Sequence, residues 1–158
     1  IMTFAGIRPQ EVTRLTWNDI FLDTPSKVIK VRSMASKTGG TRQVSICAAL
    51  EAWLRIAPHQ EDNSICPPQW PVRWAGLRYR AGWDANGKRW PNDALRHTFA
   101  SYHVLTHRDI PRLQLEMGHS SSTQIMHRYM NLSGVDQEMA ERFWNIVPEE
   151  DFYADRNA

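Results

Sequence analysis

The sequence predicts a mainly helical α+β domain with a small antiparallel β-hairpin or three-stranded sheet. Apolar residues recur at spacings of three and four over several segments, which is the period of one helix face. Between residues 19 and 46 the chain alternates apolar and polar residues instead, with a pair of glycines in the middle, as a hairpin does. A chain of 158 residues, 42% of them hydrophobic, is long enough to bury one core, so one compact domain is expected.

The first expected elements are a helix and the hairpin. Pro9 suits a first helical turn and apolar residues follow on one face, so we expect a helix from about Pro9 to Trp17, with Arg8 at its entrance. The segments VIKVR and RQVSI then alternate as strands do, and SKTGGTR carries turn glycines between them. Lys37 therefore lies just before the tip of the hairpin.

The rest of the chain favours helices. Pro58 ends a helical pattern over residues 48–57, and a short helix is expected near residues 74–81. Asn92 or Asp93 can cap a longer helix, with Arg96 near its start. The remaining expected helices are one over residues 112–117 that Gly118 closes, one through Ile125 and Tyr129 after possible caps at residues 120–122, and one over residues 135–146 before Pro148.

The composition argues against several classes of protein. No stretch approaches the roughly 18 consecutive apolar residues of a membrane-spanning helix, and no apolar run after a charged start indicates a secretory signal, so we expect a cytoplasmic protein without membrane contact. Cys47 and Cys66 lie far apart, without CxxC or Cys/His metal spacing. The sequence therefore predicts neither a disulfide framework nor a zinc site.

Charge is distributed unevenly along the chain. The net charge is only +2, from 19 basic and 17 acidic residues, which is weak support for a polyanionic partner of the chain as a whole. Acidic residues gather near the end, whereas a middle stretch with few acids carries Arg73, Arg78, Arg80, Lys88, Arg89, Arg96, Arg108 and Arg112. We expect this middle stretch, and not the tail, to face phosphates.

Five polar residues are expected at helix entrances, on helices or at the hairpin tip: Arg8, Lys37, Arg96, His119 and Tyr129. Taken singly, each has an ordinary structural interpretation as an ion pair, a turn, a helix cap or a core residue. Taken together, two arginines can hold the oxygens of one phosphate, a lysine can donate a proton and a tyrosine can attack phosphorus. The set therefore describes phosphoryl transfer without a metal or any other cofactor.

The order and local sequence of these residues resemble the catalytic domain of tyrosine recombinases of the phage-integrase type. TFAGIRPQEVTRLTWNDI resembles the first-arginine segment, with Glu11 as the usual companion of Arg8. SKTGGTRQVSI is similar to the hairpin that carries the catalytic lysine. ALRHTFASY resembles the second-arginine segment, LEMGHSSS the glycine–histidine segment and HRYMNL the segment with the nucleophile. The five segments follow in family order and span residues 3–132.

The resemblance implies a role for each residue. Arg8 and Arg96 would bind the scissile phosphate and stabilise its pentacoordinate transition state. Lys37, protonated because an ordinary lysine has a pKa of about 10.4, would donate a proton to the leaving 5′-hydroxyl. His119 would hydrogen-bond a phosphate oxygen and Tyr129 would form a 3′-phosphotyrosine. Storing the bond energy in this way would allow religation without ATP, metal or cofactor.

The resemblance also implies partners and domain organisation. Double-stranded DNA would be the substrate, and four protomers would assemble on two DNA sites from a protein that can be monomeric without DNA. The source would be bacterial or a phage. Residues 1–158 would be the C-terminal catalytic domain of a longer protein whose N-terminal core-binding domain is absent from this sequence. The last helix would pack on its own domain or dock on a neighbouring protomer, and both possibilities stay open.

Asp93 departs from the family pattern, which places histidine or lysine three residues before the second arginine. An aspartate near the phosphate is electrostatically unfavourable, although it could pair with an arginine or take the tyrosine proton. Asn92, His97 and His127 are alternative candidates for the base. One alternative function is therefore a degenerate family member that binds DNA without cutting it. A second is a DNA-relaxing enzyme similar to type IB topoisomerases, which shares the chemistry.

Overall fold

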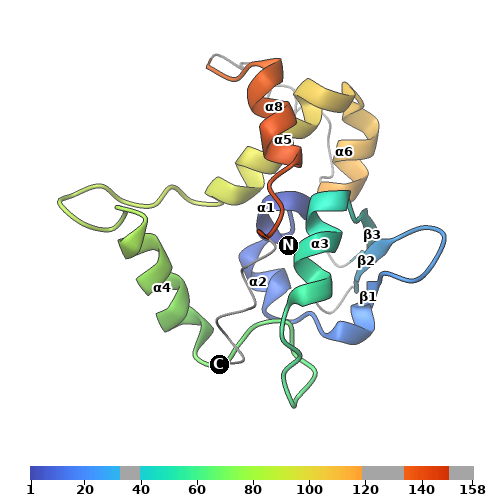
Figure 1. Ribbon diagram of the computed structural model, residues 1–158, viewed down its shortest axis with the longest axis horizontal. Helices are drawn as coiled ribbons and strands as arrows, with labels where there is room; N and C mark the ends of the chain where they lie inside the picture. The colour runs from blue at the N-terminus through green and yellow to red at the C-terminus, as the bar shows by residue number, and fades with distance from the viewer. Residues whose placement is uncertain (33–39, 119–133, 150–158) are drawn as a thin grey trace.

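The computed structural model describes residues 1–32, 40–118 and 134–149, and in them a three-stranded antiparallel sheet lies at one edge of the molecule, beside the helices (Figure 1). This arrangement confirms the predicted fold class. In chain order the elements are α1 (Met2–Ala5), α2 (Pro9–Val12), the 3-10 helix η1 (Trp17–Asp19), β1 (Ile20–Phe21), β2 (Val28–Val31), β3 (Arg42–Ser45), α3 (Ala48–Ile56), α4 (Trp70–Arg80), α5 (Ala94–His107), α6 (Ile110–Met117) and α8 (Gln137–Trp144). Lys37, His119 and Tyr129 lie outside the described residues.

The sheet confirms the expected hairpin and adds a short third strand. β2 pairs with β3 in antiparallel register, with Ile29 opposite Val44 and Val31 opposite Arg42, and β1 pairs with β2 on its other side. Successive side chains of a strand point to opposite faces. Ile29 and Val31 are therefore fully buried, whereas Lys30 between them is exposed.

The helix predicted from about Pro9 to Trp17 is shorter in the structure. The sequence pattern predicts a helix as far as Trp17, but α2 ends at Val12 and a separate 3-10 helix begins at Trp17. The reason is a local cap: both the backbone N–H and the hydroxyl of Thr16 donate to Oδ2 of Asp19, each at 3.0 Å. These bonds stabilise an extended backbone at Thr16, which interrupts the helix.

Two later helices also differ from their expected bounds, whereas α3 and α6 agree closely. α4 begins at Trp70, four residues before the expected start, because Pro71 supplies the fixed backbone angle of a first helical turn. α8 covers fewer residues than the predicted range 135–146. It begins after Asp136, whose side chain accepts from the backbone N–H of Met139 at 2.8 Å.

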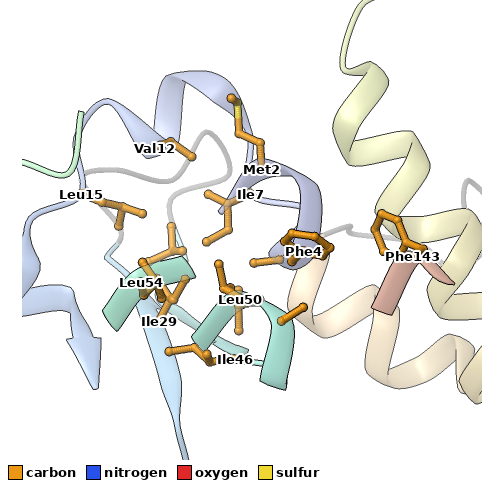
Figure 2. Packing of buried hydrophobic residues seen from close by; sticks show 14 residues of the cluster. Met2, Phe4, Ile7, Val12, Leu15, Ile29, Ile46, Leu50, Leu54 and Phe143 are labelled. Atoms are coloured by element: carbon orange, nitrogen blue, oxygen red, sulfur yellow. The ribbon is translucent and has the colours of Figure 1, made fainter. Parts of the chain in front are cut away.

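The main core lies between the sheet, the N-terminal helices and α3, and α8 closes one side of it (Figure 2). Phe143 of α8 packs against Phe4 with ring centroids 5.2 Å apart, and it stacks on Tyr102 of α5 at 4.3 Å. The last helix thus packs on its own domain in this structure. In the described part of the chain, no helix has the length and apolar character needed to cross a membrane.

Candidate functional site

Arg8 stands at the entrance of α2, as the sequence predicted. It occupies the N-cap position, and its backbone N–H donates to Oε2 of Glu11 at 3.1 Å. Its guanidinium lies 3.4 Å from Oε1 of the same carboxylate, measured from Nη1. This contact confirms the expected pairing of Arg8 with Glu11 one helical turn later, and it holds Arg8 with a side chain only 15% exposed.

The turn that leads into Arg8 depends on Gly6 and on α5. Gly6 has φ +59°, a left-handed conformation that disfavours residues with a Cβ, and a Cβ there would overlap the ring of Phe99. Arg96 lies one turn before Phe99 on α5 and donates through Nη1 to the Gly6 carbonyl. The same helix therefore contacts the turn before Arg8 with two side chains.

Arg96 is buried, with an exposed fraction of 4%. Besides Gly6, its guanidinium binds the carbonyl of Met117, with Nη2 and the oxygen 2.6 Å apart. Met117 is the last residue of α6, and a positive charge is favourable beside the unpaired carbonyls of a helix C-terminus. Arg96 thus connects the Arg8 turn to the end of α6, where Gly118 with φ +63° closes the helix as predicted.

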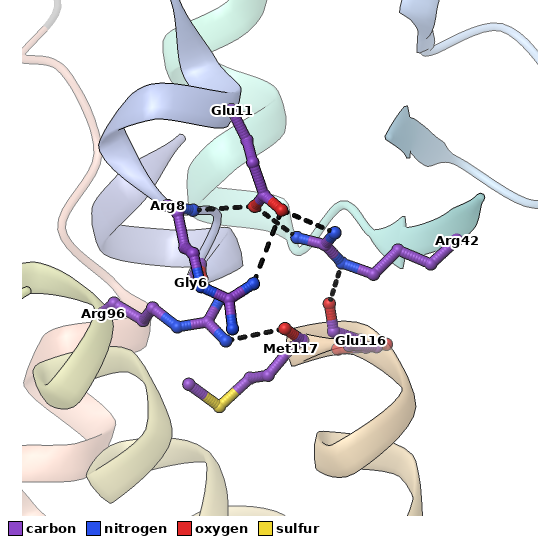
Figure 3. Close-up of polar contacts among 7 residues, drawn as sticks. All are labelled: Gly6, Arg8, Glu11, Arg42, Arg96, Glu116 and Met117. Atoms are coloured by element: carbon purple, nitrogen blue, oxygen red, sulfur yellow. Dashed lines mark hydrogen bonds and ion pairs between the residues drawn. The ribbon is translucent and has the colours of Figure 1, made fainter. Parts of the chain in front are cut away.

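Arg42 is part of this site, although the sequence pattern identifies it only as a hairpin residue. Figure 3 shows its guanidinium facing Glu11, with Nη1 3.0 Å from Oε1 and Nη2 2.6 Å from Oε2. Its Nε donates to the Glu116 carbonyl at 2.8 Å. The strand alternation carried a usable signal, because it places Arg42 on the same face as buried Val44, where a charge needs a partner.

Glu11 is the anion that these contacts surround. Its exposed fraction is 1%, and burial alone would raise the pKa of its carboxyl group. The hydrogen bonds and charge of Arg42, together with those of Arg8, outweigh burial and hold the pKa below its usual value. Glu11 is therefore ionised at neutral pH. The three arginines and one glutamate that meet here leave two positive charges in excess, which suits a phosphate.

Asp93 is placed differently from the expectation that its side chain caps the long helix. It does occupy the N-cap position of α5, but it has φ +54° and its side chain makes no capping hydrogen bond. Its side chain is exposed, and within residues 1–32, 40–118 and 134–149 it forms no ion pair with an arginine. The predicted capping bond is therefore wrong, and a role as proton acceptor stays a prediction.

The basic middle stretch is only partly a free charged surface. α4 has no fully buried residue, and Figure 1 shows it apart from the sheet and α3. Arg78 of α4 is paired with Asp84, with Nε and Oδ2 2.6 Å apart, and lies over the Trp74 ring. Arg96 from the same stretch is buried. Among the described residues, no cluster of three or more His, Cys, Asp or Glu could hold a metal ion.

The chain matches the sequence model of the phage integrase family over residues 1–134. No curated protein sequence matches it. The crystal structure of XerA recombinase is similar, at 19% identity and a TM-score of 0.60, over 99% of this chain and 56% of that one. The Tn1549 transposon integrase in complex with transposon right end DNA is similar at 17% identity and 0.56, over 89% of this chain and 55% of that one.

A third similar structure is the XerH site-specific recombinase bound to difH substrate, at 21% identity and a TM-score of 0.56, over 82% of this chain and 40% of that one. The chain therefore spans about half the length, or less, of these solved structures. At such identities the likeness demonstrates a common fold.

Proposed function

The chain belongs to the phage integrase family, and from this premise we propose that it is the catalytic part of a site-specific DNA recombinase that cuts and rejoins DNA through a 3′-phosphotyrosine. The observation that carries the proposal is the meeting of Arg8 and Arg96. The two residues are far apart in sequence, yet Arg96 binds the carbonyl of Gly6, two residues before Arg8. Two arginines at one turn are suited to bind one phosphate.

The proposed reaction is a phosphoryl transfer from the DNA strand to a tyrosine. The hydroxyl of Tyr129 attacks the phosphorus and gives up its proton to a base, for which Asp93 is the candidate. The bond from phosphorus to the 5′ oxygen breaks, and Lys37 protonates the leaving oxygen. Arg8 and Arg96 stabilise the negative charge of the transition state, and His119 donates a hydrogen bond to it. The reverse steps rejoin the strand.

We also propose double-stranded DNA as the partner and a tetramer on two DNA sites as the active assembly. Support comes from the charge balance of the site and from the structures of the Tn1549 integrase and XerH, which are DNA complexes. Arginines that bind phosphates position the DNA but do not read its bases. Recognition of a particular DNA sequence would therefore need other residues, which contact the base edges.

A covalent selection tests the proposal and identifies the DNA site in the same experiment. Duplexes of randomised sequence, with sulfur in place of one bridging 5′ oxygen, are incubated with the intact protein. Cleavage then releases a thiol, which religates poorly, so protein–DNA adducts accumulate and the selected duplexes can be sequenced. The proposal expects adducts with the parent protein and none with Tyr129→Phe. Equal adduct formation by both proteins would contradict it.

A second candidate function is DNA binding without cleavage, which the exposed Asp93 favours because the family pattern has histidine or lysine there. This candidate expects DNA affinity that falls steeply with salt and no covalent adduct. The variant Asp93→His separates the two functions. Cleavage gained by the variant would indicate a degenerate member, whereas cleavage lost by it would show that Asp93 acts in the reaction.

The third alternative, a relaxing enzyme similar to type IB topoisomerases, shares the phosphotyrosine step. It differs in its products, because relaxation needs one duplex and one protomer. Supercoiled plasmid that carries two selected sites distinguishes them. Relaxed circles without recombinant circles would favour the topoisomerase-like function, and recombinant circles would favour the recombinase.

A further inference from the structure

Arg42 uses all three nitrogen atoms of its guanidinium group within the fold. Nη1 and Nη2 bind the two carboxylate oxygens of Glu11, and Nε binds the carbonyl of Glu116. The side chains of the pair are 9% and 1% exposed. Charge-assisted bonds with this two-point geometry are strong and directional, so Arg42 fixes the carboxylate of Glu11 in position and orientation.

The strength of this pair determines how Arg8 can behave. Glu11 faces both arginines, but Arg42 binds it at 2.6 and 3.0 Å, whereas the guanidinium of Arg8 lies 3.4 Å away. Among the described residues, Glu11 is the one polar partner of the Arg8 guanidinium. Because Arg42 already neutralises the carboxylate, Arg8 is oriented by Glu11 without being held by it in a two-point pair.

Arg42 also packs directly on the chain segment that precedes His119. A Cβ built on Gly118 would lie 3.1 Å from Cδ and 3.2 Å from Nε of Arg42, so the absence of a side chain allows this close approach. The Nε of Arg42 donates to the carbonyl of Glu116, which is one of the last carbonyls of α6. Arg42 therefore holds the end of α6 in place against β3.

The position of Arg42 in the sheet completes the arrangement. It is the first residue of β3, opposite Val31 of β2, and these two strands flank the segment that contains Lys37. The side chain thus joins α2 to the end of α6, from a strand that follows the segment with Lys37 in the sequence.

We propose that Arg42 is a positioning residue that keeps Arg8 available for the phosphate and holds the end of α6, which directly precedes His119 in the sequence. This inference rests on the proposed function. Without Arg42, the carboxylate of Glu11 would have Arg8 as its remaining cation and would draw it into a two-point pair. Arg8 would then be displaced from the phosphate, and cleavage would slow even at saturating DNA.

The test compares rates of adduct formation on a duplex selected with the parent protein. Arg42→Met should lower the rate at saturating DNA by about 100-fold, which is typical of a misplaced catalytic group. The double variant Arg42→Met/Glu11→Gln removes the charge that would capture Arg8, so it should recover at least about tenfold of this loss. Arg42→Gln, which removes the charge but keeps a hydrogen-bond donor near Glu11, replaces Arg42→Met if that variant does not fold.

Ser45→Ala is the matched control. Ser45 donates to Glu116 at 2.7 Å in the same contact between β3 and α6, but it does not bind Glu11, so its loss should leave the rate unchanged. A parental rate for Arg42→Met, or a folded double variant as slow as Arg42→Met, would overturn the role of Arg42 alone. A parent protein that forms no adduct with any duplex would instead overturn the proposed function.

Discussion

The ring of Phe99 packs against the backbone of Gly6, in the space that a side chain on residue 6 would need. Gly6→Ala should therefore combine the cost of a left-handed conformation with that of an overpacked core. We expect a loss of about 2–4 kcal/mol in the free energy of unfolding, measured with urea. Gly82→Ala is the control, because Gly82 has φ +80° but no atom within 4 Å of the added Cβ. Equal losses for the two variants would contradict the packing explanation.

The buried pair of Glu11 with Arg42 predicts a large effect on stability. Glu11→Ala leaves the buried guanidinium of Arg42 without its anion, so the free energy of unfolding should fall by about 3–5 kcal/mol. Glu51 also binds two cations, Lys27 and Arg55, but these are 40% and 47% exposed. Glu51→Ala should lose less, because water can solvate its former partners. An equally large loss for Glu51→Ala would show that burial does not determine how much the ion pair of Glu11 with Arg42 contributes to the free energy of unfolding.

Much of this arrangement was predictable from the sequence, and the exceptions have physical causes. The hairpin, the helix over residues 48–57 and the glycine that closes α6 follow from local periodicity and backbone geometry, which a sequence displays directly. The end of α2 depends on a hydrogen bond between Thr16 and Asp19 that competes with the helix. Such competition between local alternatives cannot be read from periodicity alone.

In the site, too, some features follow from the local sequence and others only from the fold. The position of Arg8 at a helix entrance is local, because Pro9 and Glu11 define it within one turn. The buried ion pair of Arg42 is not, since it joins a strand to a helix far away in the sequence. Strand alternation indicates only that Arg42 faces the core, and the fold is needed to identify its partner.

His103 predicts a dependence of stability on pH. It is 3% exposed, and burial, followed by the charges of His107 and Arg112, lowers its pKa to about 4, against the opposing charges of Glu116 and Asp109. The unfolded chain binds a proton near pH 6.5, whereas the folded protein does so near pH 4. The stability contributed by neutral His103 is thus complete above pH 6.5 and is lost as pH falls toward 4.

The loss should amount to at most about 3 kcal/mol over this window. Urea unfolding at several pH values between 4 and 7 measures it, for the parent and for His103→Leu. The variant has no group to protonate at this position, so the difference in stability between the two proteins should shift in its favour as pH falls. A constant difference over the whole range would contradict the lowered pKa.

The proposed role of Lys37 predicts that a better leaving group restores cleavage by a variant without this lysine. If it protonates the leaving oxygen, Lys37→Ala should cleave normal DNA more slowly by about 100-fold or more. A thiol has a pKa of about 8.5 and leaves without protonation, so sulfur at the bridging position should restore cleavage by this variant. Rates of adduct formation on matched oxygen and sulfur duplexes provide the measurement. An equal defect on both duplexes would exclude the role of Lys37 as proton donor.

The covalent adduct tests the central proposal most directly. Adducts selected with the intact protein are digested with protease and nuclease, and the peptide that retains a nucleotide is sequenced by mass spectrometry. The proposed chemistry predicts a nucleotide attached through its 3′ phosphate to Tyr129, and no adduct with Tyr129→Phe. A nucleotide on another residue, or an undiminished adduct in the variant, would contradict it.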